Sequence, residues 1–111
     1  MNNNYNEALD ILLKKTVVGN IDWKILNPTA ISYVKKDDKG NTTSIVIQKI
    51  EDFEEYYIFT LSVNNDPAQK IQLNSLLEID TDNILKNIFT EAIKKVKNDS
   101  AEILKKLINN L

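Results

Sequence analysis

The segment 56–63 most strongly constrains how this chain can fold, because its side chains alternate with the two-residue period of a β-strand. The larger apolar side chains of one face are Tyr57, Phe59, Leu61 and Val63. The other face carries Tyr56, Ile58, Thr60 and Ser62. A strand with one strongly apolar face is stable only in a sheet that another layer covers. The chain must therefore supply further strands and at least one covering element.

Four more segments have the features of strands, and short connections separate them. These segments are residues 21–25, 30–36, 43–50 and, as a short edge strand, 70–73. Pro28 interrupts the chain after the first of them, Gly40 lies in the turn after the second, and residues 51–55 form an acidic turn before residue 56. Connections this short favour consecutive antiparallel strands. The sequence therefore predicts an antiparallel meander sheet of four or five strands.

Apolar side chains with helical spacing flank these strands on both sides. The first stripe, within a helix expected over residues 5–18, consists of Leu9, Leu12, Leu13, Thr16 and Val17. The last third has one stripe from Ile84 to Val96 and another from Ile103 to Leu111. An unbroken helix over residues 82–110 would be about 43 Å long, which is long for a domain with a radius of gyration of about 13 Å. We therefore expect a bend near residues 98–100. The alternative is a straight helix whose end projects and pairs with another chain.

These elements predict the α+β class. The expected architecture is an N-terminal helix, a four- to five-stranded antiparallel meander sheet and a C-terminal helical pair. We expect one domain over residues 1–111, with residues 1–4 frayed at its start. The predicted core consists of Leu9, Leu12, Val17, Trp23, Ile45, Ile47, Tyr57, Phe59, Leu61, Ile88 and Phe89.

The composition argues against most enzymatic chemistry. The 111 residues include no cysteine and no histidine, and all 14 basic residues are lysine. Thiolate nucleophiles and thiolate metal ligands are therefore excluded, and the usual base with a pKa near neutrality is missing. Only two glycines are present, far apart, so no glycine-rich loop can hold a phosphate. We expect no catalytic residue, no metal site and no cofactor.

The chain shows no signal for export or for a membrane. It opens without a cationic and apolar leader, and no apolar run reaches the roughly 18 residues of a membrane span. We therefore expect a cytoplasmic protein with no membrane partner. The net charge of −2 and the lack of a basic segment argue against binding to nucleic acid. A small nucleotide could still bind through lysines, backbone amides and aromatic stacking.

Charge is unevenly distributed along the chain. Residues 51–82 hold eight acidic residues and one lysine, whereas residues 83–111 hold three acidic residues and six lysines. The acidic region indicates a surface that docks on a basic protein partner; ordinary solvated loops are the alternative explanation. The candidate partner-binding residues are Glu51, Asp52, Glu54, Glu55, Tyr56 and Ile58.

The end of the chain is rich in large aliphatic side chains. Within residues 100–111 these are Ile103, Leu104, Leu107, Ile108 and Leu111. The stripe from Ile84 to Val96 is already available to cover the sheet, so this second stripe either packs beside it or stays exposed. Exposed apolar patches of this kind usually mark an interface. We therefore expect a homo-oligomer in which these five residues form the contact.

The order of elements resembles a group of small proteins from AT-rich bacteria and their phages. The features that carry the resemblance are the N-terminal helix, Ile21-Asp22-Trp23, the strand Tyr56-Tyr57-Ile58-Phe59 and the C-terminal helices. Some of these helix–sheet–helix proteins lie among counter-defence genes, so the resemblance implies a non-catalytic inhibitor that binds a defence protein or sequesters its nucleotide signal. It covers the architecture of most of the chain and includes no site motif, so it transfers no functional residue. The charge pattern leaves an alternative, an antitoxin or immunity-type protein that blocks a basic toxin surface through residues 51–82.

Overall fold

The computed structural model describes residues 3–111 and has the predicted α+β class. The elements are α1 (Asn3–Val17), β1 (Lys24–Asn27), β2 (Ala30–Lys36), β3 (Thr42–Glu51), β4 (Glu55–Val63), the 3-10 turn η1 (Pro67–Gln69), β5 (Lys70–Asn74) and α2 (Ile79–Asn109). The five strands form one antiparallel sheet in the order β1-β2-β3-β4-β5. This is the predicted meander. Fraying was predicted for residues 1–4. Residues 1–2 of that segment lie outside the described part, and the chain is helical from Asn3 on.

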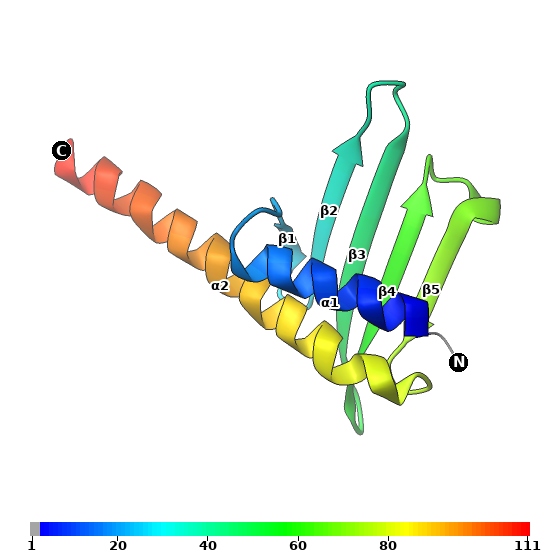
Figure 1. Cartoon of the computed structure of the whole chain (residues 1–111). Helices are drawn as coiled ribbons and strands as arrows, with labels where there is room; N and C mark the ends of the chain where they lie inside the picture. Colours follow the sequence, from blue (N-terminus) through cyan, green and yellow to red (C-terminus); the bar gives the residue numbers. More distant parts are fainter. Residues whose placement is uncertain (1–2) are drawn as a thin grey trace.

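Both helices lie over the same face of the sheet, with α1 packed against α2 (Figure 1). The row of side chains at the centre of the covered face is Ile31, Ile47, Phe59 and Leu73, one from each of four adjacent strands. All four are buried. From the helices, Leu9 and Ile88 meet this row in the same hydrophobic core. The opposite face of the sheet carries no other element of the described chain (Figure 1).

The predicted faces of β4 are confirmed, and most of the predicted core is buried. The buried members are Leu9, Trp23, Ile47, Tyr57, Phe59, Ile88 and Phe89. Leu12, Ile45 and Leu61 pack against the core while partly exposed. The prediction was wrong for Val17, which is 58% exposed at the last position of α1. Thr16 takes the inward position instead, because its hydroxyl accepts a hydrogen bond from Trp23.

Strands β2 to β5 lie within one residue of the predicted segments at each end. The first strand differs, because β1 begins at Lys24 rather than at Ile21. Ile21 and Trp23 belong to the connection after α1, and both are buried. The Trp23 indole N–H donates to Thr16 Oγ1 at 3.0 Å, and its ring centroid lies 6.0 Å from that of Tyr33. The alternating apolar residues Ile21 and Trp23 therefore belong to a connection that packs under the end of α1, and not to a strand.

The predicted C-terminal helical pair is instead one helix of 31 residues, so the expected bend near residues 98–100 is absent. Asp99 does not cap a new helix. Its carboxylate Oδ2 lies 2.8 Å from Lys95 Nζ, one turn earlier, and this ion pair supports a continuous helix. Residues 98–100 contain neither glycine nor proline, and the helix propensity of Asn, Asp and Ser costs well under about 1 kcal/mol each. A weak interruption of this kind does not break the helix.

The last part of α2 extends past β1 and away from the sheet (Figure 1). Every residue from Lys97 to Leu111 is exposed. We refer to residues 97–111 as the tail. The described residues span 55 Å in their longest direction. No helix in residues 3–111 combines the length and the apolarity needed to cross a membrane.

Candidate protein-binding site

The predicted acidic turn is the tip of the hairpin that joins β3 to β4. Glu51 and Glu55 face each other as the last residue pair of the two strands, and residues 52–54 form the tip. Phe53 is 100% exposed between Asp52 and Glu54. A fully exposed phenylalanine is unusual, because the ring offers a large apolar area and no polar group to water.

Two adjoining hollows lie beside this tip. One has a volume of about 220 Å³ and is lined by Asp52, Phe53, Glu54, Tyr56 and Leu76. The other, of about 270 Å³, shares Glu54, Tyr56 and Leu76 with the first and adds Glu55, Ser75, Ile79 and Asp82. Because the two share three residues, they form one continuous depression. We call it the acidic-apolar groove: its apolar groups come from the hairpin and from the loop before α2, and carboxylates surround them.

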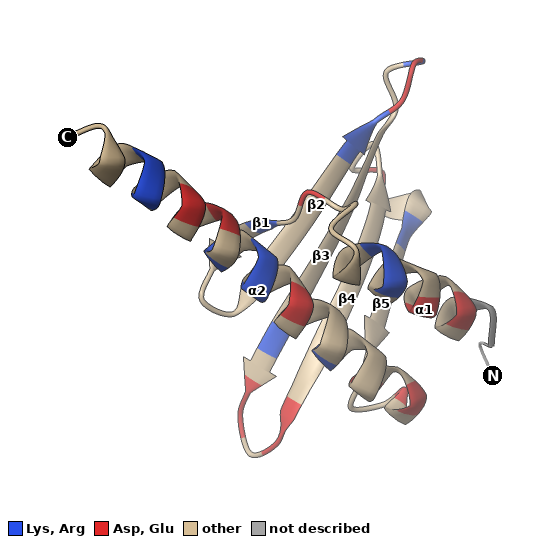
Figure 2. Cartoon of the chain, turned by 60° about the vertical axis from the view of Figure 1, so that its left-hand side comes forward, with Lys and Arg blue, Asp and Glu red and all other residues tan. Residues whose placement is uncertain are grey.

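The carboxylates of the groove differ in how far they are neutralised. Lys49 Nζ lies 3.0 Å from Glu51 Oε1 and 3.2 Å from Glu55 Oε1. The hydrogen bond from Lys49 holds the pKa of Glu55 below its ordinary value, and the hydrogen bonds to Glu51 and then to Glu55 raise the pKa of Lys49. Asp52 and Glu54 form no ion pair with any residue in the described part of the chain. Figure 2 shows acidic residues at this end of β3 and β4 and at the start of α2.

Ser75 fastens the two sides of the groove together. This serine is 2% exposed, and its backbone N–H donates to the Tyr57 carbonyl at 2.9 Å. Its Oγ accepts the Tyr57 backbone N–H at 2.8 Å and donates to Asp82 Oδ1 at 2.7 Å. The serine thus links β4 to the first turn of α2. We conclude that the loop carrying Leu76 is held in place beside the hairpin.

Tyr57 supports the groove from the core side. Its ring lies 5.6 Å from that of Phe89, and its hydroxyl donates to Glu55 Oε2 at 3.3 Å. Burial, followed by the negative charge of Glu55, raises the pKa of Tyr57 to about 12. The phenol therefore stays neutral and remains a hydrogen-bond donor to Glu55 at physiological pH.

The structure brings most of the predicted partner-binding residues together. The groove is lined by Asp52, Glu54, Glu55 and Tyr56. Glu51 lies next to it, because Lys49 forms ion pairs with both Glu51 and Glu55. Ile58 does not line it. Its side chain lies on the uncovered face of the sheet, in the row of Gln48 and Asn74.

Sequence reasoning missed Phe53, Leu76 and Ile79 as site residues. One signal for Phe53 was available, since this aromatic stands between two acidic residues and has no apolar neighbour at strand spacing. Leu76 and Ile79 gave no such signal. They join the site only because the chain after β5 turns back beside the hairpin.

The groove has the chemistry of a binding surface. Within residues 3–111, no three His, Cys, Asp or Glu side chains gather closely enough to hold a metal ion. The carboxylates repel phosphates and other anions and attract lysine and arginine side chains. The apolar groups between them can bury an aliphatic side chain. These properties together match a basic protein segment with an apolar residue in it.

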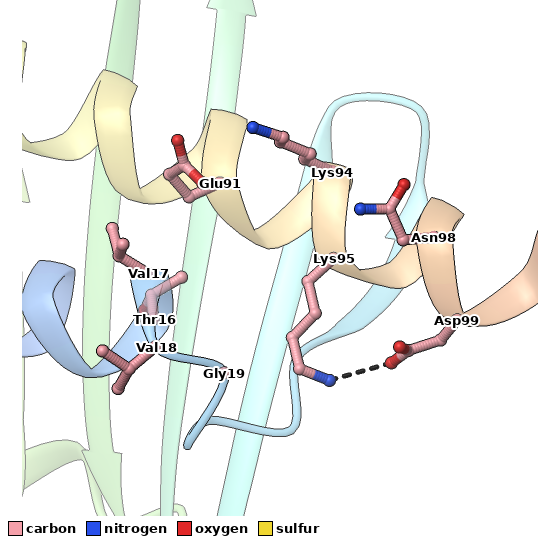
Figure 3. A pocket seen from close by; sticks show the side chains of 9 residues that line it. All are labelled: Thr16, Val17, Val18, Gly19, Glu91, Lys94, Lys95, Asn98 and Asp99. Atoms are coloured by element: carbon pink, nitrogen blue, oxygen red, sulfur yellow. Dashed lines mark hydrogen bonds and ion pairs between the residues drawn. The ribbon is translucent and has the colours of Figure 1, made fainter.

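A larger hollow, of about 420 Å³, lies between the end of α1 and the middle of α2 (Figure 3). Its charged groups have both signs, and Lys95 points to Asp99 rather than into open space (Figure 3). The Lys95 stem passes over Gly19, where an added Cβ would lie 3.3 Å from its Cε. Gly19, with a φ of +83°, forms the turn that ends α1. The Lys95 side chain packs on this turn. We therefore assign these groups a structural role at the helix end.

The chain matches no protein-family model, no curated protein and no solved structure. Its function is therefore inferred from the chemistry of its own surface, above all from the acidic-apolar groove.

Proposed function

We propose that this chain is a non-catalytic binding protein that captures a basic segment of a protein partner in the acidic-apolar groove. The observation that carries the proposal is Phe53, which stands fully exposed between two acidic residues and beside two hollows. Covering a phenylalanine ring contributes about 1.5–3 kcal/mol. A partner that packs on Phe53 gains this energy while its cations meet Asp52 and Glu54.

The groove also defines the features that the partner needs. An aliphatic side chain of the partner would lie against Tyr56 and Leu76, which are shared by the two hollows. Lysines or arginines on either side of it would meet the unpaired carboxylates. Electrostatic attraction of this kind raises the association rate more than the final affinity, and salt weakens it. An anionic nucleotide lacks these features and would be repelled.

Two biological roles use such a surface. One is an inhibitor that covers a basic surface of a defence protein, as the resemblance to counter-defence proteins implies. The other is an antitoxin or immunity-type protein that covers a basic toxin surface. Both roles use the same groove, and neither requires catalysis. The neighbouring genes separate them: phage structural genes favour the first role, and an adjacent toxin gene favours the second.

The test uses a synthetic peptide in which a leucine stands between lysines, with binding followed by amide NMR. We expect the peptide to shift the signals of Phe53, Tyr56 and Leu76. A peptide with serine in place of the leucine should bind more weakly, and one with glutamates in place of the lysines should not bind. In the protein, Phe53→Ala and the Asp52→Asn, Glu54→Gln double variant should each lower the affinity at least about fivefold, which corresponds to about 1 kcal/mol.

Matched control variants are available at the opposite end of the sheet. Asp38→Asn removes an exposed carboxylate from the hairpin between β2 and β3, and Val34→Ala shortens a side chain that is exposed on β2. Both should bind the peptide like the natural chain. Equal affinity of the Phe53→Ala variant and the natural chain, or equal binding of the lysine and glutamate peptides, would contradict the proposal.

A further inference from the structure

The tail presents an apolar stripe that nothing in the described chain covers. Its members are Ile103, Leu104, Leu107, Ile108 and Leu111, each between 54% and 97% exposed. Steps of three and four residues place them on one side of the helix. The same stripe continues inward to Ile93 and Val96, which pack against the core. The uncovered side chains are thus the outer half of a stripe whose inner half packs against the core.

An apolar hollow lies at the root of the tail. It has a volume of about 340 Å³, and its lining includes Ile25 and Pro28 from β1 and the following turn, and Ile93 and Lys97 from α2. β1 is an edge strand, so no further strand closes this side of the sheet. The hollow therefore extends the apolar stripe onto the body of the molecule.

We infer that a second copy of this chain covers the stripe, with the two tails antiparallel and each Leu104 opposite its own counterpart. In this register, Leu107 and Ile108 of one copy lie opposite Ala101 and Ser100 of the other. Large side chains thus meet small ones, which allows the two helices to pack closely. Leu111 lies opposite the partner's Lys97, beside the hollow at the root of the partner tail.

The hollow at the root of each tail favours the same orientation. A parallel arrangement would leave both hollows empty, because each Leu111 would lie at the far end from them. Glu102 and Lys106 lie on the side of the helix away from the stripe, so they take no part in the contact.

The size of this contact reaches the lower limit for a specific interface. The stripes of two copies contribute ten large aliphatic side chains. Removing each from water buries on the order of 100 Å², so the stripes alone account for on the order of 1,000 Å². A specific interface needs about this area. The inference is independent of the proposed binding function, because the groove lies at the opposite end of α2.

The first test is the mass in solution, by sedimentation or light scattering, from about 1 to 100 µM. We expect the full chain to have twice the 12.7 kDa of one copy. The Leu104→Glu, Leu107→Glu double variant should be monomeric with an unchanged circular dichroism spectrum, because both side chains are exposed in one copy. Val34→Glu, a matched change at an exposed aliphatic on β2, should remain a dimer. A monomeric full chain at about 100 µM would overturn the inference.

The second test measures the relative orientation of the two tails. The chain has no natural cysteine, so only the introduced thiols can form a disulfide. We expect Leu104→Cys to form a disulfide with its counterpart on mild oxidation. Leu111→Cys should not, because in the antiparallel register the two introduced thiols are about 20 Å apart. Efficient cross-linking of both variants would overturn the antiparallel pairing.

Discussion

At the scale of single residues, buried hydrogen bonds decide positions that hydrophobic patterning leaves open. Thr16 is 2% exposed, and its hydroxyl both donates to the Leu12 carbonyl at 2.8 Å and accepts from Trp23 at 3.0 Å. Val17, its neighbour, has the more apolar side chain and yet points to solvent. The indole N–H of a buried tryptophan needs an acceptor, and valine cannot supply one. The hydroxyl therefore determines which side of α1 faces inward at its last turn.

This pairing predicts the effect of two substitutions at Thr16. Thr16→Val keeps the shape but leaves the Trp23 N–H without its acceptor, so it should lower the free energy of unfolding by about 1–3 kcal/mol. Thr16→Ser keeps the hydroxyl. Denaturant unfolding measures the free energy, and hydrogen exchange of the Trp23 indole N–H provides the specific readout. Exchange should accelerate in the valine variant and stay slow in the serine variant; a valine variant as stable as the natural chain would show that the hydrogen bond contributes nothing.

At the scale of elements, the covered face of the sheet and the continuity of α2 carry the fold. Each central strand contributes one side chain to the row that contains Ile47 and Phe59, so neighbouring strands depend on one another for burial. Helix α2 crosses this row and then continues as the tail. Ser75 and Asp82 fasten its first turn to β4. The same helix therefore serves the core at its middle and the two proposed interfaces at its ends.

The two faces of β4 should respond differently to truncation. Phe59→Ala removes a buried ring and should cost about 3–5 kcal/mol of unfolding free energy. Thr60→Ala, on the adjacent position and the uncovered face, should cost less than about 1 kcal/mol. Urea denaturation of both variants measures the difference. A loss below about 1 kcal/mol for Phe59→Ala would mean that the covered face is not the main core.

At the scale of the whole molecule, the groove and the tail lie at opposite ends of α2. The groove includes Ile79 and Asp82 from the first turn of the helix, whereas the tail begins at Lys97. In the proposed antiparallel dimer, the two grooves face outward at the far ends of the assembly. Such a dimer would present two identical binding sites to a repetitive or dimeric target. Its overall affinity for that target would exceed the affinity of a single site.

This separation predicts that the tail affects avidity and leaves the intrinsic affinity of the groove unchanged. The Leu104→Glu, Leu107→Glu double variant should bind the free lysine–leucine peptide as tightly as the natural chain. On a surface densely coated with the same peptide, it should dissociate about 100-fold faster than the natural chain. Surface plasmon resonance at two coating densities measures both quantities. Weaker binding of the free peptide by the tail variant would show that the tail and the groove are coupled.

The sequence alone determined the features that depend on local periodicity. The two-residue alternation around Phe59 defined β4 and its faces, and the short turns defined the meander, because these patterns reflect burial within one element. The acidic hairpin at residues 51–55 and the aliphatic stripe after residue 100 were likewise visible. Only the tertiary structure decided what depends on contacts between distant segments. It placed Leu76 and Ile79 in the groove, because the chain after β5 turns back beside the hairpin. The continuity of α2 through Asp99, by contrast, has a local cause: residues 98–100 contain neither glycine nor proline, and the Lys95–Asp99 ion pair spans one turn of the helix.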